Sequence, residues 1–200
     1  WISLDDLENY KAKYRQPVKG KFSDYDIISM GPPSSGGLLL VHMLNMLSEV
    51  IDKSKNQSID LSYNSSDYIH VLTEIERRAY ADRSEHLGDS DYWDVPTELF
   101  LSKSYAKTRA DGIDLYNATL SNTIKHGNSK SAESEETTHY SVVDENGNAV
   151  SVTTTINSGY GSGITITGAG FLMNNEMDDF SIKPGVPNLF GLLGNEANAI

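Results

Sequence analysis

The residues with the clearest chemical potential lie where a polar stretch ends and a strand-like run begins. Residues 119–136 carry few apolar side chains and are predicted to be exposed and mobile, whereas residues 138–143 are β-branched, aromatic or polar and are predicted to form a buried strand. A cut before Thr137 would give this threonine a free α-amine. With an ordinary pKa of about 8, that amine can act as a general base for the threonine hydroxyl near neutral pH. Composition alone favours a plainer role for Thr137, as the start of a strand.

Four polar residues downstream could complete such a site. Thr155 ends a threonine-rich run, and Asn157 precedes a Ser-Gly pair that is typical of a turn. Glu176 and Asp179 stand three residues apart in an acidic cluster. Taken singly, these residues are equally compatible with a strand residue, a turn residue, and solvated loop charges or weak calcium ligands.

Composition excludes several classes of function. The chain has 200 residues, 38% hydrophobic residues and a net charge of −12, so it resembles an ordinary globular protein that repels phosphate backbones, and we expect no nucleic-acid partner. The absence of cysteine excludes disulfides and thiolate chemistry. The five histidines have no metal-ligand spacing and residues 159–163 match no nucleotide-binding motif, so we expect neither a metal nor a cofactor.

The ends of the chain and its apolar runs bear on its organisation. No run reaches the roughly 20 apolar residues that a membrane span needs, so no span is expected in this chain. The chain opens on Trp1-Ile2-Ser3, which is unlike a natural start, and we interpret the chain as an excerpt of a longer protein.

The periodicity predicts helices first and strands later. A capping box at Ser3 and Asp6 predicts a short helix that ends near Lys13. Further helices are predicted over residues 37–51, 66–87 and 97–111, and a buried strand over residues 26–30. The apolar residues predicted to form the buried stripe of the second long helix are Ile69, Leu72, Ile75 and Ala79. Asn146-Gly147 between residues 138–143 and 149–156 predicts a β-hairpin.

Several of these segments together resemble the gamma-glutamyltranspeptidases, which are N-terminal nucleophile hydrolases. The resemblance rests on Pro-Pro-Ser-Ser-Gly-Gly at 32–37, Ala-Tyr-Ala-Asp-Arg-Ser at 79–84, Thr-Thr-His-Tyr-Ser-Val-Val-Asp at 137–144 and Asn-Asn-Glu-Met-Asp-Asp-Phe at 174–180. Shorter matches lie at residues 87–89, 147–150 and 183–188. These motifs occur in the order of the family and cover essentially the whole chain.

The resemblance implies a fold class and a division of the chain. The implied fold is α+β, a four-layer αββα sandwich with helices outside two packed sheets, of which this chain is only a part. Residues 1–136 would be the mostly helical end of a large subunit, finishing in a flexible tail. Residues 137–200 would be the β-rich start of a small subunit, and the two subunits would arise from one precursor.

The resemblance also implies a reaction. The precursor would cleave itself between Glu136 and Thr137, and the freed Thr137 would attack the γ-glutamyl amide bond of glutathione or a related compound. The resulting γ-glutamyl-threonine ester would pass its acyl group to water, an amino acid or a dipeptide. Two covalent steps of this kind predict ping-pong kinetics.

The family pattern assigns roles to the downstream residues. Thr155 matches a threonine that orients the nucleophile. Asn157, Glu176 and Asp179 match residues that hold the α-amino and α-carboxyl groups of the glutamyl substrate, and carboxylates suit an ammonium group because charge-assisted hydrogen bonds are strong. Family members carry either Gln or Glu at position 176, so a charge there is not expected to be essential.

The family's active site also needs residues that this chain lacks. They are an arginine upstream, and a serine pair and the oxyanion-hole glycines downstream. Loss of one oxyanion donor costs about 3–4 kcal/mol of transition-state stabilisation, so the isolated chain is expected to be inactive.

Three other interpretations stay open. The chain could come from a cephalosporin-type acylase, from a poly-γ-glutamate depolymerase on the same scaffold, or from a non-catalytic binding homologue. The family implies a periplasmic or extracellular location.

Overall fold

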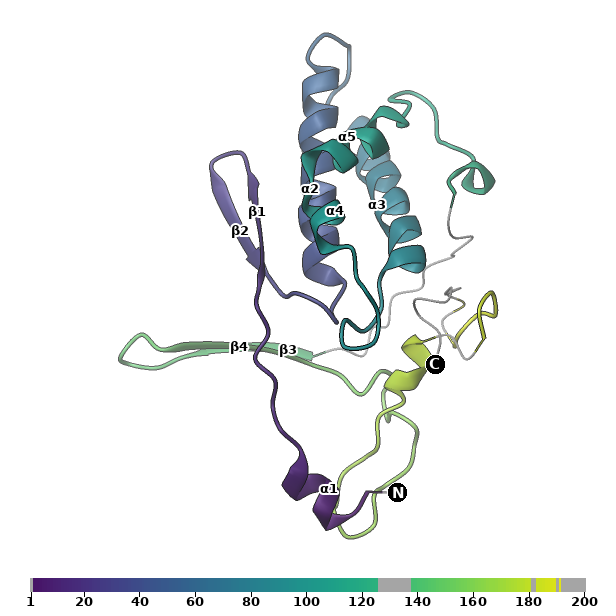
Figure 1. The fold of residues 1–200 in the computed structure, drawn as a ribbon. Helices are drawn as coiled ribbons and strands as arrows, with labels where there is room; N and C mark the ends of the chain where they lie inside the picture. The colour runs from purple at the N-terminus through teal and green to yellow at the C-terminus, as the bar shows by residue number, and fades with distance from the viewer. Residues whose placement is uncertain (1, 126–137, 181–182, 190, 192–200) are drawn as a thin grey trace.

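The computed structural model describes residues 2–125, 138–180, 183–189 and 191 (Figure 1). Its elements follow a mixed helix and strand order. They are α1 (Leu4–Asn9), β1 (Val18–Phe22), β2 (Tyr25–Ser29), α2 (Gly36–Ser54), α3 (Ser66–His86), α4 (Thr97–Leu101), α5 (Lys103–Asp111), the 3₁₀ turn η1 (Ser121–Thr123), β3 (Thr138–Val143), β4 (Ala149–Thr154) and the 3₁₀ turn η2 (Glu176–Asp179). The predicted helix-first, strand-later order therefore holds, with one additional hairpin, β1–β2, near the start.

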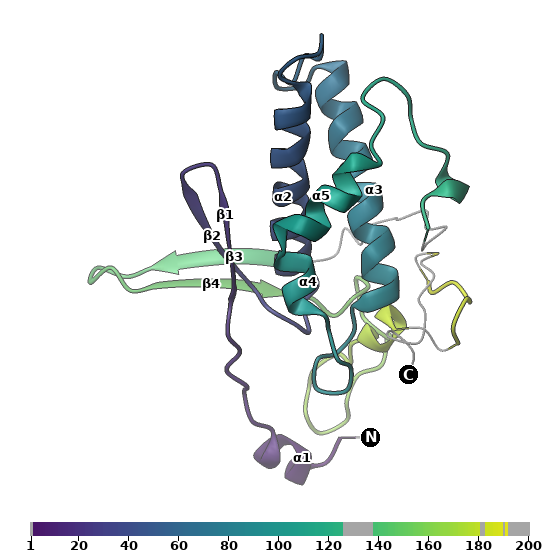
Figure 2. The same ribbon diagram turned by 45° about the horizontal axis from the view of Figure 1, so that its top comes forward.

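Helix α2 is the centre of the helical layer. It lies alongside α3, while α4 and α5 cross its face (Figures 1 and 2). Its apolar run is largely buried as predicted, and the fully buried Leu38, Met46 and Val50 pack in one core with Ile75 and Phe100. Burial of each such side chain stabilises the fold by about 1.5–3 kcal/mol. This core therefore fixes the start of α2 relative to the end of α3.

The predicted helix over residues 97–111 is interrupted at Ser102. This residue has an extended backbone (φ −74°, ψ 134°), and its hydroxyl accepts a hydrogen bond from the backbone N–H of Tyr105 at 3.2 Å. Serine is a favoured N-cap because its side chain satisfies a first-turn N–H group. A cap inside an otherwise helical pattern therefore splits the segment into α4 and α5.

Helix α3 begins and ends close to its predicted bounds, but one residue of its predicted buried stripe was wrong. Ile69 is 52% exposed, whereas Val71 and Ile75 are buried. The buried face also contains Glu74 and Arg78, which form an ion pair with both side chains almost fully buried. Apolar spacing alone missed this polar part of the interface.

Segment 119–136 was predicted to be exposed and mobile, and its described beginning differs. Thr119 is half-buried, and its hydroxyl and backbone N–H both donate to the carboxylate of Glu74, at 2.6 and 3.2 Å. Residues 126–136 lie outside the described residues. The prediction was wrong at Thr119 because it considered only apolar burial. Hydrogen bonds to the buried carboxylate of Glu74 fix the position of this polar residue instead.

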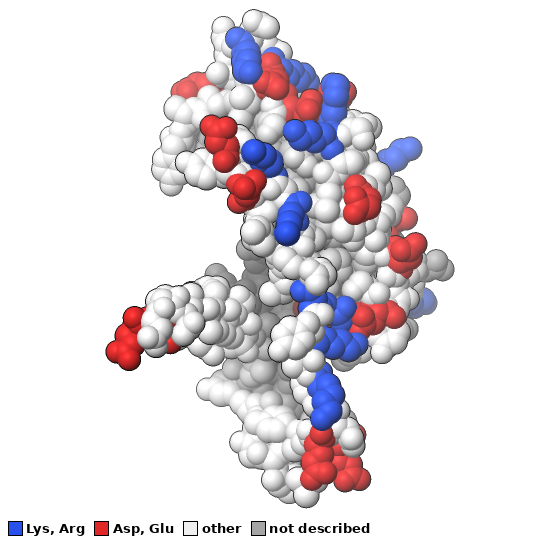
Figure 3. Space-filling model, turned by 60° about the vertical axis from the view of Figure 1, so that its left-hand side comes forward, with Lys and Arg blue, Asp and Glu red and all other residues white. Residues whose placement is uncertain are grey.

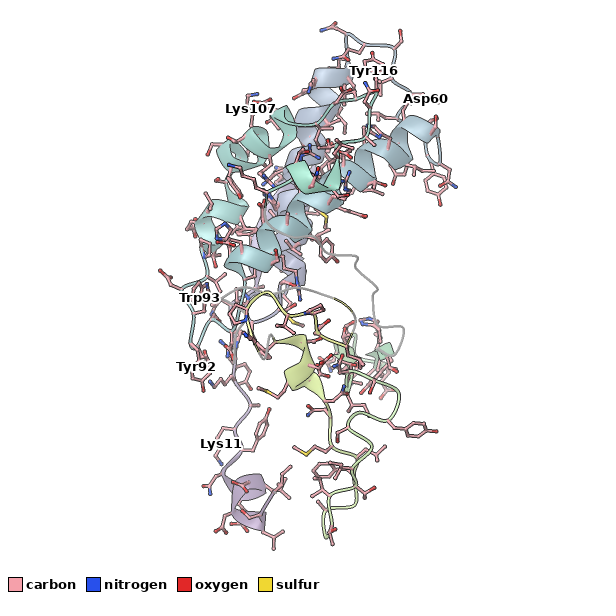
Figure 4. All side chains as sticks on the ribbon, turned by 90° about the vertical axis from the view of Figure 1, so that its right-hand side faces the viewer. Lys11, Asp60, Tyr92, Trp93, Lys107 and Tyr116 are labelled. Atoms are coloured by element: carbon pink, nitrogen blue, oxygen red, sulfur yellow. The ribbon has the colours of Figure 1, made fainter. Side chains whose placement is uncertain are left out.

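The N-terminal helix is shorter than predicted. The capping box of Ser3 and Asp6 is present, yet α1 ends at Asn9 instead of Lys13. Beyond it the chain is extended and is held by Lys13 and Arg15, which both pair with Asp91 in the loop between α3 and α4. Figure 4 shows Lys11 on this segment, on the side of Tyr92 and Trp93 in the same loop.

The predicted strand at residues 26–30 exists as β2, but its predicted burial was wrong. Ile28 is 68% exposed and Met30 is 62% exposed. Strand β2 pairs only with β1, in an antiparallel ladder from Val18↔Ser29 to Phe22↔Tyr25. Both strands of this hairpin contact α2, and a Cβ added at Gly20 would lie 2.6 Å from the Val41 side chain.

The predicted hairpin of β3 and β4 is confirmed. Its ladder runs from Thr138↔Thr154 to Val143↔Ala149. At the turn, the Asp144 carboxylate accepts hydrogen bonds from the backbone N–H groups of Asn146 and Asn148, and Gly147 takes a positive φ of 82°. This left-handed conformation is the reason for glycine there.

The prediction that β3 is buried was wrong for this chain. The hairpin projects away from the helices as an arm that is charged only at its tip (Figures 1 and 3). Its apolar side chains are largely exposed, including Tyr140 at 50%, Val142 at 58% and Val150 at 59%. A two-stranded sheet has no neighbour to cover its apolar face, and such a hairpin is marginally stable alone.

The four-layer sandwich is not formed by the described residues. They contain two separate two-stranded sheets beside one helical layer. None of the described helices is long and apolar enough to cross a membrane.

Candidate active site

Two of the predicted site residues, Glu136 and Thr137, lie outside the described residues. Their immediate neighbour Thr138 opens β3 and pairs with Thr154 at the end of β4. At this end of the hairpin, β4 is followed by Thr155, and β3 begins at the residue that follows Thr137 in the sequence. The predicted nucleophile and the predicted orienting threonine are thus attached to the same end of one hairpin.

Thr155 is the first residue after β4, and it starts a tight turn. Its side-chain oxygen accepts a hydrogen bond from the backbone N–H of Asn157 at 2.9 Å. The residue is exposed, so its hydroxyl hydrogen can be directed to another group. This arrangement orients the hydroxyl without requiring a buried position.

Asn157 is only 4% exposed and adopts a left-handed backbone with φ of 76°. Asparagine tolerates this region better than most residues. Its side-chain Nδ2 donates to the backbone carbonyl of Asn175 at 3.0 Å, and the backbone N–H of Asn175 donates to Ile156 at 3.2 Å. These bonds join two segments that are 18 residues apart in the sequence.

The side chain of Asn175 strengthens the same junction. Its Oδ1 accepts hydrogen bonds from the backbone N–H of Ser158 at 3.2 Å and from the Ser158 hydroxyl at 3.0 Å. The Ser158 hydroxyl also lies 2.7 Å from the carbonyl of Gly161, to which it can donate. A side chain at Gly161 would meet the Met173 carbonyl at 2.3 Å, so the two segments are in close contact here.

Glu176 and Asp179 lie together on η2, so the structure brings the two predicted carboxylates to one place. Burial raises the pKa of both groups. The neighbouring negative charge of Asp179 also raises the pKa of Glu176.

The helical layer also contributes to this site. The start of α2 and the end of α3 lie on the side of η2 (Figures 1 and 2). The positive charge of Arg83, near the end of α3, acts to lower the pKa of Asp179. The Nε of Arg83 donates to the Ser35 hydroxyl at 3.1 Å, directly before α2. Arg83 thus places a counter-charge near the carboxylate pair.

The arrangement has the features of a site for a cationic ligand. Both carboxyl groups lie on η2, and Oε1 of Glu176 is buried with no hydrogen-bond partner among the described residues, whereas Asp179 is exposed. A buried acceptor without a partner costs about 1–3 kcal/mol, which a ligand N–H group can recover. Across the described ranges, no group of three or more His, Asp or Glu side chains could hold a metal ion.

Sequence reasoning assigned no role in the site to Asn175, Ser158, Arg83 or Ser35. Three of them lie inside segments that carried the family resemblance, and Ser158 follows Asn157 directly. The signal was therefore the presence of unexplained polar residues in these segments. Their partners come from distant parts of the chain, which a local pattern does not reveal.

The family model for gamma-glutamyltranspeptidase matches residues 1–200. The chain belongs to the gamma-glutamyltranspeptidase family. The glutathione hydrolase proenzyme of Escherichia coli (strain K12) is 48% identical over 199 residues, which are 100% of this chain and 33% of that protein. The acylase ACY 1 proenzyme of Pseudomonas sp. (strain SE83) is 37% identical over 92% of this chain and 31% of that protein.

A solved structure supports the same family. The crystal structure of Helicobacter pylori gamma-glutamyltranspeptidase matches with a TM-score of 0.55 and 40% identity, covering 67% of this chain and 37% of that chain. The present chain spans about a third of the length of the curated relatives that it matches.

Proposed function

We propose that the complete protein is an autoprocessing γ-glutamyl hydrolase and transferase with Thr137 as its nucleophile. The observation that carries this proposal is the carboxylate pair of Glu176 and Asp179, which is tied by hydrogen bonds to the turn that holds Thr155 and Asn157. A γ-glutamyl substrate has an ammonium group at the end remote from the scissile bond. A carboxylate pair near the nucleophile-bearing hairpin suits that group.

The processing step follows from the chemistry of threonine. The Thr137 hydroxyl attacks the carbonyl carbon of Glu136, the peptide C–N bond breaks, and an ester forms while the amine of Thr137 takes up a proton. Water then hydrolyses this ester, which leaves a carboxylate on Glu136 and a free hydroxyl and α-amine on Thr137. The two subunits are thus residues up to 136 and residues from 137 onward.

Catalysis reuses the same hydroxyl. The α-amine of Thr137 accepts the hydroxyl proton as the oxygen attacks the γ-carbonyl carbon, and the proton passes to the leaving amine. Thr155 orients the nucleophile by a hydrogen bond. Water, or the amine of an amino acid or a dipeptide, then attacks the γ-glutamyl ester and regenerates Thr137.

We further propose that the exposed β3–β4 arm joins larger sheets in the complete protein, within a four-layer αββα sandwich. The support is the exposed apolar face of the hairpin, on which Tyr140, Val142 and Val150 lie at 50–59% exposure. Glutathione and related γ-glutamyl compounds are the proposed donors of the γ-glutamyl group. The similar E. coli protein is named glutathione hydrolase proenzyme, which supports this choice. A periplasmic or extracellular location is proposed on the same family grounds.

The proposal is tested by following the intact mass of the complete precursor at neutral pH beside a Thr137→Ala variant. The precursor should split between Glu136 and Thr137, and the variant should stay whole. The processed protein should then release amine from a γ-glutamyl anilide and from glutathione. If neither protein splits, the N-terminal threonine mechanism is excluded and a binding function on this scaffold becomes the better explanation.

An acylase is the second candidate, because a relative named as an acylase is also similar to this chain. The decisive comparison is the turnover of glutathione, poly-γ-glutamate and an acyl-antibiotic by the processed protein. The carboxylate pair predicts a preference for donors with a free α-ammonium group. Faster turnover of an acyl-antibiotic that lacks this ammonium group would favour the acylase.

A further inference from the structure

The structure contains a hydrogen-bonded junction between the turn after β4 and the segment before η2. Four hydrogen bonds link residues 156–158 to Asn175, and two more, between Ser158 and Gly161, close the turn itself. The turn carries Asn157, and the other segment leads directly into Glu176. The junction therefore sets the distance between the two parts of the proposed substrate site.

Asn175 is the residue through which most of these bonds pass. Its backbone N–H and carbonyl bind Ile156 and Asn157, and its side-chain Oδ1 accepts both donors of Ser158. All of these partners belong to one turn. The side chain of Asn175 thus adds the bond from the Ser158 backbone N–H to the backbone pairing, and it shares the single Ser158 hydroxyl hydrogen with the carbonyl of Gly161.

We propose that Asn175 is a positioning residue, which acts with Ser158 to fix Asn157 relative to the carboxylates of Glu176 and Asp179. This proposal rests on the proposed function, since it concerns the site for the γ-glutamyl group. Asn175 itself directs its side-chain oxygen to Ser158, so its effect on the substrate passes through the residues that it holds. A misplacement of about 1 Å in such a site can cost up to about 100-fold in rate or affinity.

Two competing roles give different results on mutation. If Asn175 only stabilised the fold, its loss would reduce the yield of processed protein and leave the kinetics of the folded fraction unchanged. If it positions the substrate groups, autoprocessing should continue because Thr137 needs no external substrate for that step. The KM for the γ-glutamyl donor should then rise while kcat changes little.

The test uses the complete precursor and a γ-glutamyl anilide as the probe. Asn175→Ala removes the shared acceptor, and we expect about a tenfold higher KM, less than a threefold change in kcat, and normal cleavage before Thr137. Asn175→Asp keeps an acceptor oxygen, so at neutral pH it should recover most of the loss. Ser162→Ala is the matched control, because Ser162 also donates to a backbone carbonyl in this region, that of Met173, but is exposed and makes no contact with Asn175.

A double-mutant cycle isolates the contact itself. Ser158→Ala removes the hydroxyl that reaches Asn175, and Ser158→Thr keeps a hydroxyl. If both residues act through one junction, adding Ser158→Ala to Asn175→Ala should raise KM by less than twofold beyond the single Asn175 variant. Independent, multiplying effects would overturn the proposal, as would a KM for Asn175→Ala within twofold of the parent value.

Two further readouts keep the outcome decisive. If Asn175→Ala is not processed, the decision rests on Ser158→Ala against Ser158→Thr, and equal KM values for these two variants would contradict the proposal. If the processed parent protein has no γ-glutamyl activity, the proposed function fails. The junction is then tested by amide hydrogen exchange, and unchanged protection of residues 156–161 in Asn175→Ala would overturn it.

Discussion

Replacement of Arg78 by Met should destabilise the protein, because it leaves the buried carboxylate of Glu74 with only the less buried Arg77 as its counter-charge. The side chains of Arg78 and Glu74 are 6% and 1% exposed, and Nη1 of Arg78 lies 2.6 Å from the Glu74 carboxylate. The second guanidinium nitrogen donates to the carbonyl of Gly112 at 2.7 Å and to the hydroxyl of Thr119 at 3.1 Å. Arg78 therefore connects α3 to the end of α5 and to the segment that leads toward the processing site.

The magnitude follows from the loss of one partner of a buried pair. Such a loss costs about 3–5 kcal/mol, whereas removing the charge of both partners together is often close to neutral. Because Arg77 still pairs with Glu74, the free energy of unfolding of Arg78→Met in the complete protein, measured with urea, should fall toward the lower end of that range, by about 3 kcal/mol. In the double variant with Glu74→Gln, more than half of the lost stability should return, because the single side-chain oxygen of Gln can still accept one of the two bonds from Thr119.

A surface pair in the same chain provides the control. Lys107 and Asp111 form an ion pair four residues apart on α5, and both side chains are 58% exposed. Lys107→Ala should change the free energy of unfolding by no more than about 0.5 kcal/mol. A loss for Arg78→Met as small as that for Lys107→Ala, or a double variant no more stable than Arg78→Met, would refute the reasoning.

The pH dependence of this effect has a definite sign. Burial raises the pKa of Glu74, but hydrogen bonds from Thr119 and Arg78 outweigh it, and the net pKa lies below the ordinary value of 4.5. A carboxylate with a lowered pKa contributes stability above its ordinary pKa and loses this contribution as the pH falls through the folded-state value. The difference between the parent protein and Arg78→Met should therefore shrink as the pH falls below about 4.5.

Three further predictions concern the proposed site. Arg83→Gln removes a positive charge that lowers the pKa of Asp179. The acidic limb of the plot of kcat/KM against pH should therefore move to higher pH, while the alkaline limb stays in place. An unmoved acidic limb would exclude Arg83 as the counter-charge. Gly161→Ala should lower kcat/KM by more than tenfold, because the new methyl group would lie 2.3 Å from the Met173 carbonyl at a positive φ of 56°. Gly163→Ala shares the positive φ but has open space around it, so it should have a clearly smaller effect, and equal effects would show that backbone strain alone matters. The 200-residue chain by itself should show no turnover of a γ-glutamyl anilide above background, since the arginine and oxyanion groups of the family lie elsewhere; turnover by the isolated chain would contradict this.

The sequence alone determined the order of the elements and most helix bounds. The cap at Ser3 and the turn at Asn146-Gly147 are local signals, because they depend on residues only a few positions apart in the sequence. The family resemblance likewise came from short motifs, and it identified Thr155, Asn157, Glu176 and Asp179 as candidates. The roles of these residues, and those of Glu136 and Thr137, stay predictions.

Only the tertiary structure decided burial and pairing. The exposure of Ile28 and Ile69, the break at Ser102 and the burial of Glu74 with Arg78 depend on what the rest of the chain places against each residue. The same holds for Asn175, whose partners in the turn after β4 lie 17 and 18 residues away. Apolar periodicity reports one face of a single element, whereas hydrogen bonds and charges between distant segments form only when the fold brings them within about 3 Å, so local patterns cannot specify them.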